Sequence, residues 1–372
     1  MSQRVPPASP VTSAGTKRRR RRATGTQEEA TVEQLDLGPD EKPKARPPTK
    51  RTATTMLPVQ KVSQPRVGQT GRALSAEVEA AVADFVANVQ RAGVDGLRKE
   101  FVDLKQYVAP DFRYEAFTAN PQRNRYKDVV CLEASRVVLT LNVPPESDYV
   151  HANYVKLEGV ERTFVAAQGP IEKTIPDFWR MAHQLEAGSV IMLCKTMEDG
   201  KPKCVQYFPL EAGAHKHSMF VTTKRVDQED KFVTYTLEVL PEGCSNATFL
   251  KLIHVTDWPD RGVPSSGISV LRLIRSIPTG ACIVHCSAGV GRTGTVLAIE
   301  AAMQRLFKMG INVNIREIVK EIRNQRASAV QTEAQFVFIH GAILDYIRAK
   351  VPAKYREMVQ QFHEEVKKAG MV

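Results

Sequence analysis

The segment 281–294 limits what this chain of 372 residues can fold into more than any other part of it. Ala281 to Val284 form a short apolar run that is typical of a buried strand, and His285 to Gly294 follow with three glycines before a helical pattern begins. Glycines let successive backbone N–H groups face inward, and a following helix adds free donors and the positive end of its dipole. The sequence therefore predicts a strand, a loop and a helix N-terminus that together bind a tetrahedral oxyanion.

Cys286 lies at the mouth of this predicted loop and is the candidate nucleophile. The loop amides and the fixed charge of Arg292 favour the thiolate form of the cysteine over the thiol. The planar guanidinium of Arg292 is able to hold two phosphate oxygens at once, which a lysine does not do with the same geometry. The hydroxyl of Thr293 is expected to reach the thiolate. A buried structural cysteine in a turn is the alternative, but it explains neither the glycines nor the arginine.

Residues 1–72 differ in composition from the rest of the chain. They hold nine of the 22 prolines and no aromatic residue, and their 15 Lys and Arg against 6 Asp and Glu supply most of the net charge of +11. Such a stretch does not bury enough apolar surface to offset its chain entropy, so we expect a disordered basic tail. Its run Lys17–Arg22 is a candidate contact for a nuclear import factor, an acidic membrane or a nucleic acid, with a solvated charged tail as the alternative. Because the remaining residues are nearly neutral, binding of nucleic acid is not expected to be the main function.

Periodicity and capping residues predict the order of the elements. A helix is expected from the N-cap Ser75 to Gly93, and a second from Gly96 to Lys105. Residues 124–257 alternate like strands, apart from one helix that begins near Pro176. The rest is helical, with predicted helices over 266–276, 292–309, 314–326, 332–349 and 354–369. We therefore expect one α/β or α+β domain in which helices flank a sheet.

Residues 76–350 resemble the catalytic domain of the tyrosine-specific, cysteine-based protein phosphatases. The resemblance is carried by His285–Gly294 together with Asn124–Val129, Asp148–Tyr154 and Phe164–Pro170. It implies a highly twisted mixed central sheet flanked by helices, and a non-receptor enzyme with a single catalytic domain. The expected division is a tail over 1–72, a catalytic domain over 73–352 and a C-terminal amphipathic helix over 353–372.

The same resemblance implies roles for the residues that bind substrate. Tyr126 would stack on the phosphotyrosine ring and set the depth of the cleft, and Asp128 would accept N–H groups of the substrate backbone. Read without the family, Tyr126 fits an ordinary half-buried core position equally well. The loop residues would bind the phosphate, and His285 would support the loop. The phosphate-binding residues are Ser287, Ala288, Gly289, Val290 and Gly291.

Two further segments resemble parts of the family that supply the general acid. In Met197–Cys204, Glu198 would orient Arg292 by an ion pair, and Lys203 would contact the acid loop. Thr256–Asp260 is similar to that mobile loop, with Asp260 as the acid and Trp258 in support. Enclosure among apolar groups is expected to raise the pKa of Asp260 so that it retains its proton.

The last family signature is similar to Arg323–Arg326 and Val330–Gln335. By that likeness Gln331, and after it Gln335, would position the water that hydrolyses the intermediate. The chain departs from the family pattern at Arg261, where an aromatic residue is usual, and at Arg123, where Lys is common. Arg261 is expected to alter closure of the acid loop or to favour acidic substrates.

These residues together predict a protein-tyrosine phosphatase that works through a phosphocysteine intermediate. A catalytically silent phosphotyrosine-binding scaffold is the first alternative, because Arg261 could impair loop closure. A dual-specificity phosphatase is the second, and the aromatic ring of Tyr126 argues against it, since a deep cleft keeps the short phosphoserine from Cys286.

No metal or organic cofactor is expected, because Arg292 and the loop amides supply the charge stabilisation that a metal would give. His215 and His217 lie in a polar stretch without other ligands at metal spacing. The chain holds no apolar run long enough to span a bilayer and opens without the apolar core of a signal peptide. We therefore expect an intracellular protein, in the cytoplasm or, through Lys17–Arg22, in the nucleus.

Overall fold

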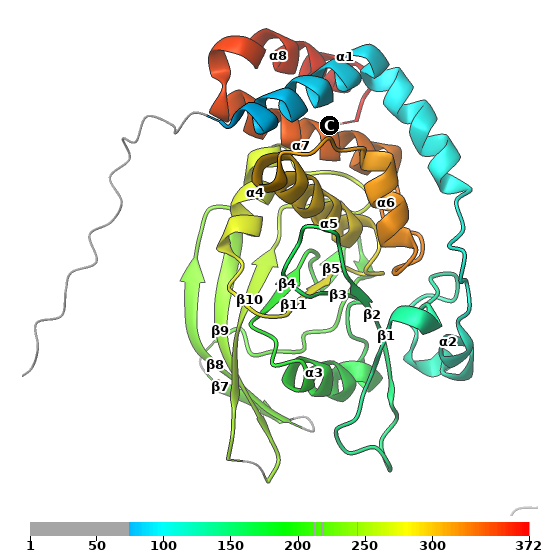
Figure 1. Cartoon of the computed structure of the whole chain (residues 1–372). Coiled ribbons are helices and arrows are strands. Elements are labelled where there is room, and N and C mark those ends of the chain that lie inside the picture. Colours follow the sequence, from blue (N-terminus) through cyan, green and yellow to red (C-terminus); the bar gives the residue numbers. More distant parts are fainter. Residues whose placement is uncertain (1–73, 212, 217–218, 244, 372) are drawn as a thin grey trace, which may run out of the picture. The chain divides into compact units, whose positions relative to one another are not determined.

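The computed structural model describes residues 74–211, 213–216, 219–243 and 245–371 (Figure 1). The predicted tail over 1–72, including the run Lys17–Arg22, lies outside these residues, so the prediction for it stays open. The described part is built on one large sheet whose strands run in the order β1-β2-β3-β11-β4-β10-β9-β8-β7, beside a separate hairpin of β5 and β6. The strands are β1 (Arg136–Val138), β2 (Tyr149–Val155), β3 (Phe164–Ala167), β4 (Ser189–Met192), β5 (Met197–Glu198), β6 (Lys201–Pro202), β7 (Gly213–Lys216), β8 (Met219–Gln228), β9 (Phe232–Pro241), β10 (Thr248–Val255) and β11 (Cys282–His285).

The middle of the sheet is parallel and its two sides are antiparallel. Strand β11 pairs in parallel with β3 and β4, and β10 pairs in parallel with β4. All other pairs in the large sheet are antiparallel. The predicted mixed central sheet is confirmed. Because four neighbouring strands run the same way, their carboxyl ends meet at one edge, which is where ligands bind in open sheets of this kind.

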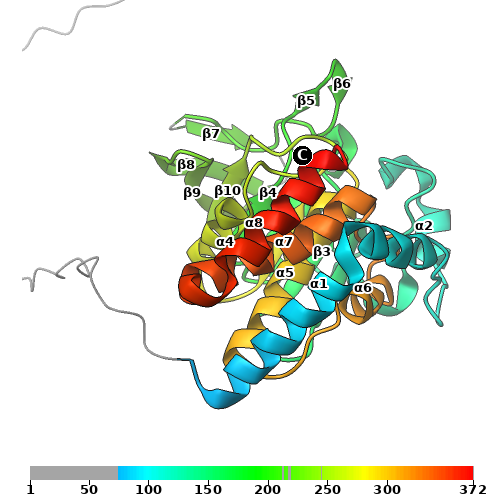
Figure 2. The ribbon, with the colours of Figure 1, turned by 90° about the horizontal axis from the view of Figure 1, so that it is seen from above.

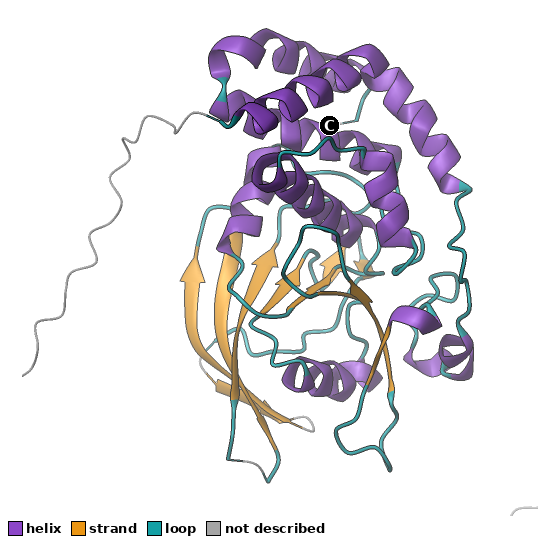
Figure 3. Ribbon diagram, viewed as in Figure 1, coloured by secondary structure: helices purple, strands orange, loops and turns teal. Residues whose placement is uncertain are grey.

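Helices flank the sheet unequally (Figure 3). Helix α3 contacts β2 and β8 on one side, and the long helices of the C-terminal half gather on the other (Figures 1 and 3). The α-helices are α1 (Ala76–Lys105), α2 (Glu115–Ala119), α3 (Ile175–Gln184), α4 (Gly267–Ser276), α5 (Gly291–Gln304), α6 (Ile315–Arg323), α7 (Glu333–Lys350) and α8 (Pro352–Lys368). Short 3₁₀ turns cover Pro121–Arg123, Glu133–Ser135 and Glu172–Thr174, and a π-helical turn over Arg305–Met309 continues α5.

The predicted helices agree with these bounds to within a few residues, and side-chain caps begin α1, α4, α6 and α7. The Ser75 side chain accepts a hydrogen bond from the N–H of Val78 at 3.4 Å, as the sequence suggested. The two helices predicted before and after Gly93 lie within α1 on either side of a kink at this residue. Gly93 has φ 59° and ψ 178°, a conformation that glycine adopts at little cost, and the helix resumes directly after it.

Side chains of helix α8 belong to the main buried core. Val359 is fully buried, and Phe362 and Val366 are 5% and 6% exposed. These side chains join the same buried cluster as the sheet and the helices over it. Figure 2 shows α8 beside α7 and α1, in the outer layer of helices. The helix is therefore required to cover the apolar surface of α7 and α1.

Candidate active site

The phosphate-loop segment follows β11 directly. The chain leaves the buried strand at His285, turns through 286–290 and enters α5 at Gly291. The side chain of Cys286 is nearly buried, and the backbone N–H of Gly289 donates to its sulfur at 3.2 Å. Gly289 has φ 71°, and a Cβ at this position would lie 1.9 Å from the carbonyl oxygen of Ala167. Only glycine fits here, so the close approach of the loop to β3 explains this residue of the motif.

Arg326 holds the shape of the loop from beneath. Its side chain is fully buried, and its guanidinium donates to the carbonyl oxygens of Gly289 at 3.0 Å and Ala288 at 2.9 Å. A third bond, at 2.7 Å, goes to the amide oxygen of Asn153 on β2. The motif Arg323–Arg326 contains this residue but gives no indication of its role. Its partners lie about 40 and 170 residues away in the chain, so no local pattern reveals them.

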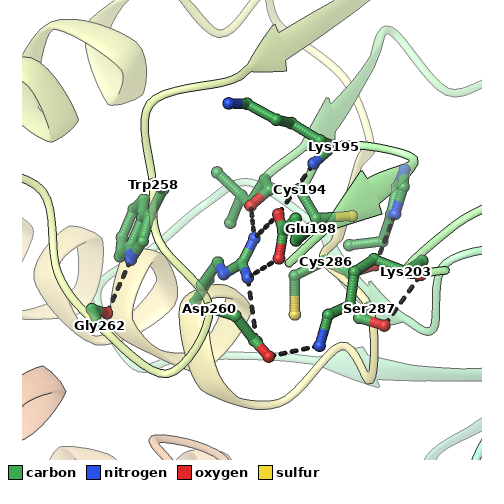
Figure 4. Close-up of polar contacts among 12 residues, drawn as sticks. Cys194, Lys195, Glu198, Lys203, Trp258, Asp260, Gly262, Cys286 and Ser287 are labelled. Atoms are coloured by element: carbon green, nitrogen blue, oxygen red, sulfur yellow. Dashed lines mark hydrogen bonds and ion pairs between the residues drawn. The ribbon is translucent and has the colours of Figure 1, made fainter. Parts of the chain in front are cut away.

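Arg292 is fixed in a buried network at the start of α5. Its two terminal nitrogens donate to the two carboxylate oxygens of Glu198 at 2.7 and 2.5 Å, and one of them also donates to the carbonyl oxygen of Leu193 at 2.7 Å. The N–H of Lys195 donates to Glu198 at 3.0 Å (Figure 4). Burial opposes the charge of Arg292, but the bonds to Glu198 outweigh it and raise the pKa of the guanidinium. The cleft therefore keeps a fixed, oriented positive charge.

Asp260 reaches into the same cleft from the loop that follows β10. One carboxylate oxygen accepts from Arg292 at 3.0 Å, and the other contacts the ammonium of Lys203 (Figure 4). Burial alone raises the pKa of Asp260. The hydrogen bond from Lys203 and the charge of Arg292 lower this pKa by more than burial raises it, so the net shift is downward. The expected rise of this pKa is therefore wrong, because Lys203 and Arg292 contact the carboxylate of Asp260.

The loop that carries Asp260 is anchored at both ends. Trp258 is 3% exposed, packs edge-on against Phe338 of α7 and donates from its ring nitrogen to the carbonyl oxygen of Gly262 at 3.1 Å. The hydroxyl of Thr332 donates to the carbonyl oxygen of Arg261 at 3.1 Å. Arg261 itself is exposed and has φ 56°, which is uncommon for a residue with a side chain. The loop thus sits against the start of α7, with Arg261 at its turn.

Tyr126 and Asp128 also line the cleft. The cleft is a depression of about 500 Å³ that both residues line together with Cys286, Arg292 and Asp260. The hydroxyl of Tyr126 is 2.7 Å from the hydroxyl of Ser287, which donates to the carbonyl oxygen of Lys203 at 2.9 Å. The aromatic ring is half-buried, and its polar end is tied to the loop beside the cysteine.

The two glutamines differ in their surroundings. Gln331 is exposed and lines the cleft. Gln335 is 1% exposed, and its side-chain oxygen accepts from the N–H groups of Gln331 at 2.9 Å and Thr332 at 3.3 Å. Gln335 therefore caps the start of α7 as well as lining the cleft.

Two other predicted site residues are buried behind the loop. The hydroxyl of Thr293 is buried and has no hydrogen-bond partner among the described residues, so its expected bond to the Cys286 sulfur is not formed here. His285 is fully buried, and its Nε2 lies 2.7 Å from the hydroxyl of Tyr207. Burial lowers the pKa of His285 to about 4, so the ring is neutral at physiological pH and supports the loop without adding charge.

The remaining predictions concern Arg123 and the histidines. Arg123 pairs with the buried Asp177 of α3, away from the cysteine. His215 lies on β7, and His217 lies outside the described residues. In the part of the chain that the structure describes, no three His, Cys, Asp or Glu side chains are grouped as metal ligands require. In the same part, no helix is long and apolar enough to cross a bilayer.

Comparisons with known proteins point to one family. A family model described as Protein-tyrosine phosphatase matches residues 120–345. The chain is 34% identical over 273 residues to Receptor-type tyrosine-protein phosphatase zeta of Rattus norvegicus, an alignment that covers 68% of this chain and 12% of that protein. It is 34% identical over 287 residues to Receptor-type tyrosine-protein phosphatase eta of Homo sapiens, an alignment that covers 73% of this chain and 21% of that protein. It is 37% identical over 247 residues to Receptor-type tyrosine-protein phosphatase epsilon of Homo sapiens, where the alignment covers 61% of this chain and 34% of that protein. The chain thus spans about a third or less of the length of these relatives.

Proposed function

Because the chain belongs to the protein-tyrosine phosphatase family, we propose that it hydrolyses phosphotyrosine in proteins through a phosphocysteine intermediate, and we assign this activity to residues 73–352. The observation that carries the proposal is that Cys286 and Arg292 of one segment and Asp260 of another line one cleft. A nucleophile, an oriented cation and an acid are the groups that transfer of a phosphoryl group to a thiol requires.

In the first step the thiolate of Cys286 attacks phosphorus, the S–P bond forms and the bond from phosphorus to the tyrosine oxygen breaks. Arg292 and the loop amides, including that of Gly289, stabilise the charge on the equatorial oxygens. Glu198 accepts from both terminal nitrogens of Arg292, so the guanidinium needs little reorganisation when the phosphate arrives. Asp260 gives its proton to the departing phenolate.

The proton on Asp260 is coupled to substrate binding in this scheme. Lys203 and Arg292 lower the pKa of Asp260, which favours the carboxylate. A phosphate dianion bound to Arg292 neutralises that charge and adds a negative one, and both changes raise the pKa of the nearby carboxyl. Asp260 therefore takes up a proton as the substrate binds and has it available for the leaving group.

In the second step water attacks the phosphocysteine, the S–P bond breaks and phosphate leaves. Asp260, now a carboxylate, accepts a proton from the water, and Gln331 orients it from the edge of the cleft. Gln335 acts on this step through the backbone, because it holds the N–H groups at Gln331 and Thr332. The cysteine is returned as the thiolate, so the cycle balances without a metal or cofactor.

The two alternatives predict different results. A catalytically silent scaffold would keep the cleft and bind phosphotyrosine without turnover. Such a protein usually lacks one of the reactive groups, whereas Cys286, Arg292 and Asp260 are all present in this chain. A dual-specificity phosphatase needs a shallow cleft, whereas the ring of Tyr126, bonded through its hydroxyl to Ser287, forms a wall that favours the longer phosphotyrosine. The cytoplasmic or nuclear location, the non-receptor character and an anionic partner of Lys17–Arg22 stay predictions.

The test is phosphate release from a phosphotyrosine peptide and its phosphoserine counterpart by the full chain. We expect turnover of the phosphotyrosine peptide alone, loss of turnover in Cys286→Ser and a drop of about 10²- to 10⁴-fold in Asp260→Ala. Tight binding of the peptide by the unmodified chain without turnover would favour the scaffold. Equal rates on both peptides would favour the dual-specificity enzyme.

A further inference from the structure

A depression between three helices lies apart from the catalytic cleft. It has a volume of about 550 Å³, which is within the range of pockets that hold small molecules. Its lining comes from α1, from the start of α6 and from α7, and Figure 2 shows α1 beside the other two helices. Among the described residues, none lines both this depression and the cleft around Cys286. We call this depression the helical recess.

The inner surface of the helical recess is apolar apart from one histidine. Its buried lining residues are Phe85, Val89 and Leu97 of α1, Ile315 of α6 and His340 of α7. The residues that α1 contributes stand before and after Gly93, so the recess spans the kink of this helix. Such a surface favours a ligand with an apolar or aromatic body.

His340 adds a hydrogen-bond acceptor to this apolar surface. The residue is 4% exposed, and its ring stacks on Phe85 with 6.1 Å between the ring centres. Burial lowers the pKa of His340 to about 4, so the ring is neutral at physiological pH. Nδ1 lies 3.0 Å from the carbonyl oxygen of Phe336 and therefore carries the ring hydrogen, which leaves Nε2 as an acceptor.

Nε2 of His340 has no hydrogen-bond partner within the described part of the chain. It is also not one of the fully enclosed side-chain atoms, so it opens into the recess that the ring lines. A polar atom in a nearly buried side chain loses water contacts and gains little in return unless a partner binds to it. A ligand that donates a hydrogen bond to Nε2 would supply that partner.

Glu100 gives the rim of the helical recess a negative charge. The residue is half-buried, and with the other described residues its carboxyl forms neither a hydrogen bond nor an ion pair. Burial raises the pKa of Glu100, and the more distant charge of Arg316 offsets only part of this rise. The carboxylate therefore lacks a close cation, and a ligand that carries one would stabilise it.

The other charged side chain of the rim is Arg91. It is exposed and donates to the amide oxygen of Asn88 at 3.1 Å. Arg91 stands nine residues before Glu100, which corresponds to about 13 Å of helix, so it opposes a cation at Glu100 only weakly. The rim thus has separate positive and negative sides, and the negative side is the less hydrated one.

We propose that the helical recess binds a small amine whose apolar body carries a hydroxyl group. The ammonium pairs with Glu100, the hydroxyl donates to Nε2 of His340, and the body packs on the apolar wall of α1. This site is separate from the catalytic cleft, and the inference does not rest on the proposed phosphatase activity.

The experiment measures the Kd of three related compounds for the full chain by ligand-observed NMR titration. Tyramine joins a hydroxyl to an ammonium through an aromatic ring, phenethylamine lacks the hydroxyl, and 4-hydroxyphenylacetate carries a carboxylate in place of the ammonium. We expect phenethylamine to bind about three- to tenfold more weakly than tyramine, the size of one hydrogen bond. The carboxylate compound should bind more than about tenfold more weakly, because it meets Glu100 with a like charge.

Variants test where the amine binds. His340→Phe should abolish the preference for tyramine over phenethylamine, since the hydroxyl loses its acceptor while the aromatic wall remains. Glu100→Gln should weaken both amines about three- to tenfold and leave their ratio unchanged. The matched control is Glu79→Gln, an exposed carboxylate of α1 that does not line the recess, and it should change neither Kd. Thermal unfolding shows whether each variant is folded, and Glu100→Gln decides the matter if His340→Phe is not.

Inorganic phosphate distinguishes the helical recess from the catalytic cleft. Saturating phosphate should leave the Kd of tyramine unchanged, because the two depressions share no lining residue among those described. A Kd that rises with phosphate would place the amine in the cleft and overturn the inference. Equal affinity for all three compounds, an unchanged Kd in Glu100→Gln, or no binding of tyramine would overturn it as well. Turnover of the phosphotyrosine peptide is measured separately, so none of these results bears on the proposed function.

Discussion

At the scale of single residues, the cleft is organised by competition for two cations. Arg292 is shared between Glu198 and Asp260, and Lys203 contacts Asp260 from the other side. Glu198 has the shorter bonds to Arg292, so it fixes the guanidinium, whereas Asp260 is held at 3.0 Å by the same group. The acid is therefore the partner that a phosphate displaces most readily, and its protonation depends on both cations.

The pH dependence of turnover should respond to Lys203. Lys203 lowers the pKa of Asp260, so Lys203→Met should raise it. A higher pKa keeps Asp260 protonated to higher pH, so the alkaline limb of the profile of kcat against pH should move to higher pH. The measurement is kcat on a phosphotyrosine peptide across the pH range. Lys201→Met, which removes the exposed lysine of the same hairpin, should leave the limb where it is; an equal movement in both variants would assign the effect to general charge.

Arg326 should matter for stability and turnover together. Arg326→Met leaves the carbonyl oxygens of Ala288 and Gly289 and the amide oxygen of Asn153 without their donor in a buried site. We expect a loss of about 2–4 kcal/mol in the free energy of unfolding, measured by urea denaturation, and a fall in kcat of more than about tenfold as the loop loses its shape.

The matched control for Arg326 is Arg316→Met, which removes an arginine of α6 whose only ion pair among the described residues, with Asp103, is 3.8 Å long. It should cost less than about 0.5 kcal/mol and leave kcat unchanged. Unchanged turnover in folded Arg326→Met would contradict the role of this side chain in shaping the loop.

At the scale of elements, sequence patterns predicted the features that depend on interactions between neighbouring residues. Ser75 caps α1, and Thr332 with Gln335 forms the capping box of α7, so the starts of these helices follow from neighbouring residues. The sheet order and the partners of Arg326 depend on contacts between distant segments, and no periodicity reveals them. The downward shift of the Asp260 pKa also escaped prediction, because it needs the positions of Lys203 and Arg292.

The cap of α7 links helix stability to the acid loop. The hydroxyl of Thr332 accepts from the N–H of Gln335 at 3.2 Å and donates to the carbonyl oxygen of Arg261 at 3.1 Å. Thr332→Val should cost about 1 kcal/mol of stability through the lost cap, and it should lower kcat because the loop loses an anchor. Thermal unfolding and peptide turnover measure the two effects.

A comparison with another helix cap separates the effect of Thr332 on kcat from its effect on stability. Asn314 caps α6, where its side chain accepts from the N–H of Glu317 at 3.3 Å, remote from the cleft lining. Asn314→Ala should cause a similar loss of stability with no change in kcat. If Thr332→Val behaves in the same way, the bond to Arg261 has no part in turnover.

At the scale of the whole described unit, one core supports the cleft. The carboxyl ends of β3, β4, β10 and β11 lead into the segments that carry Gly169, Leu193, Asp260 and Cys286. The buried cluster that includes these strands also includes α1, α7 and α8. The reactive groups thus sit on loops held by a rigid, continuous interior, and any ligand of the cleft is linked to the stability of the entire unit.

Inorganic phosphate should therefore stabilise the unit as a whole. At a phosphate concentration about 100 times its Kd, binding to the native state alone adds about 2.7 kcal/mol to the free energy of unfolding. For a unit of this size that corresponds to a rise in Tm of about 5 °C, in one transition that includes α8. Arg292→Met removes the fixed charge of the cleft and should abolish the rise, whereas Lys99→Met, at an exposed residue of α1 that does not line the cleft, should keep it. An equal rise in Arg292→Met would mean that phosphate binds elsewhere on the molecule, and a second transition that does not respond to phosphate would mean that part of the unit unfolds independently of the cleft.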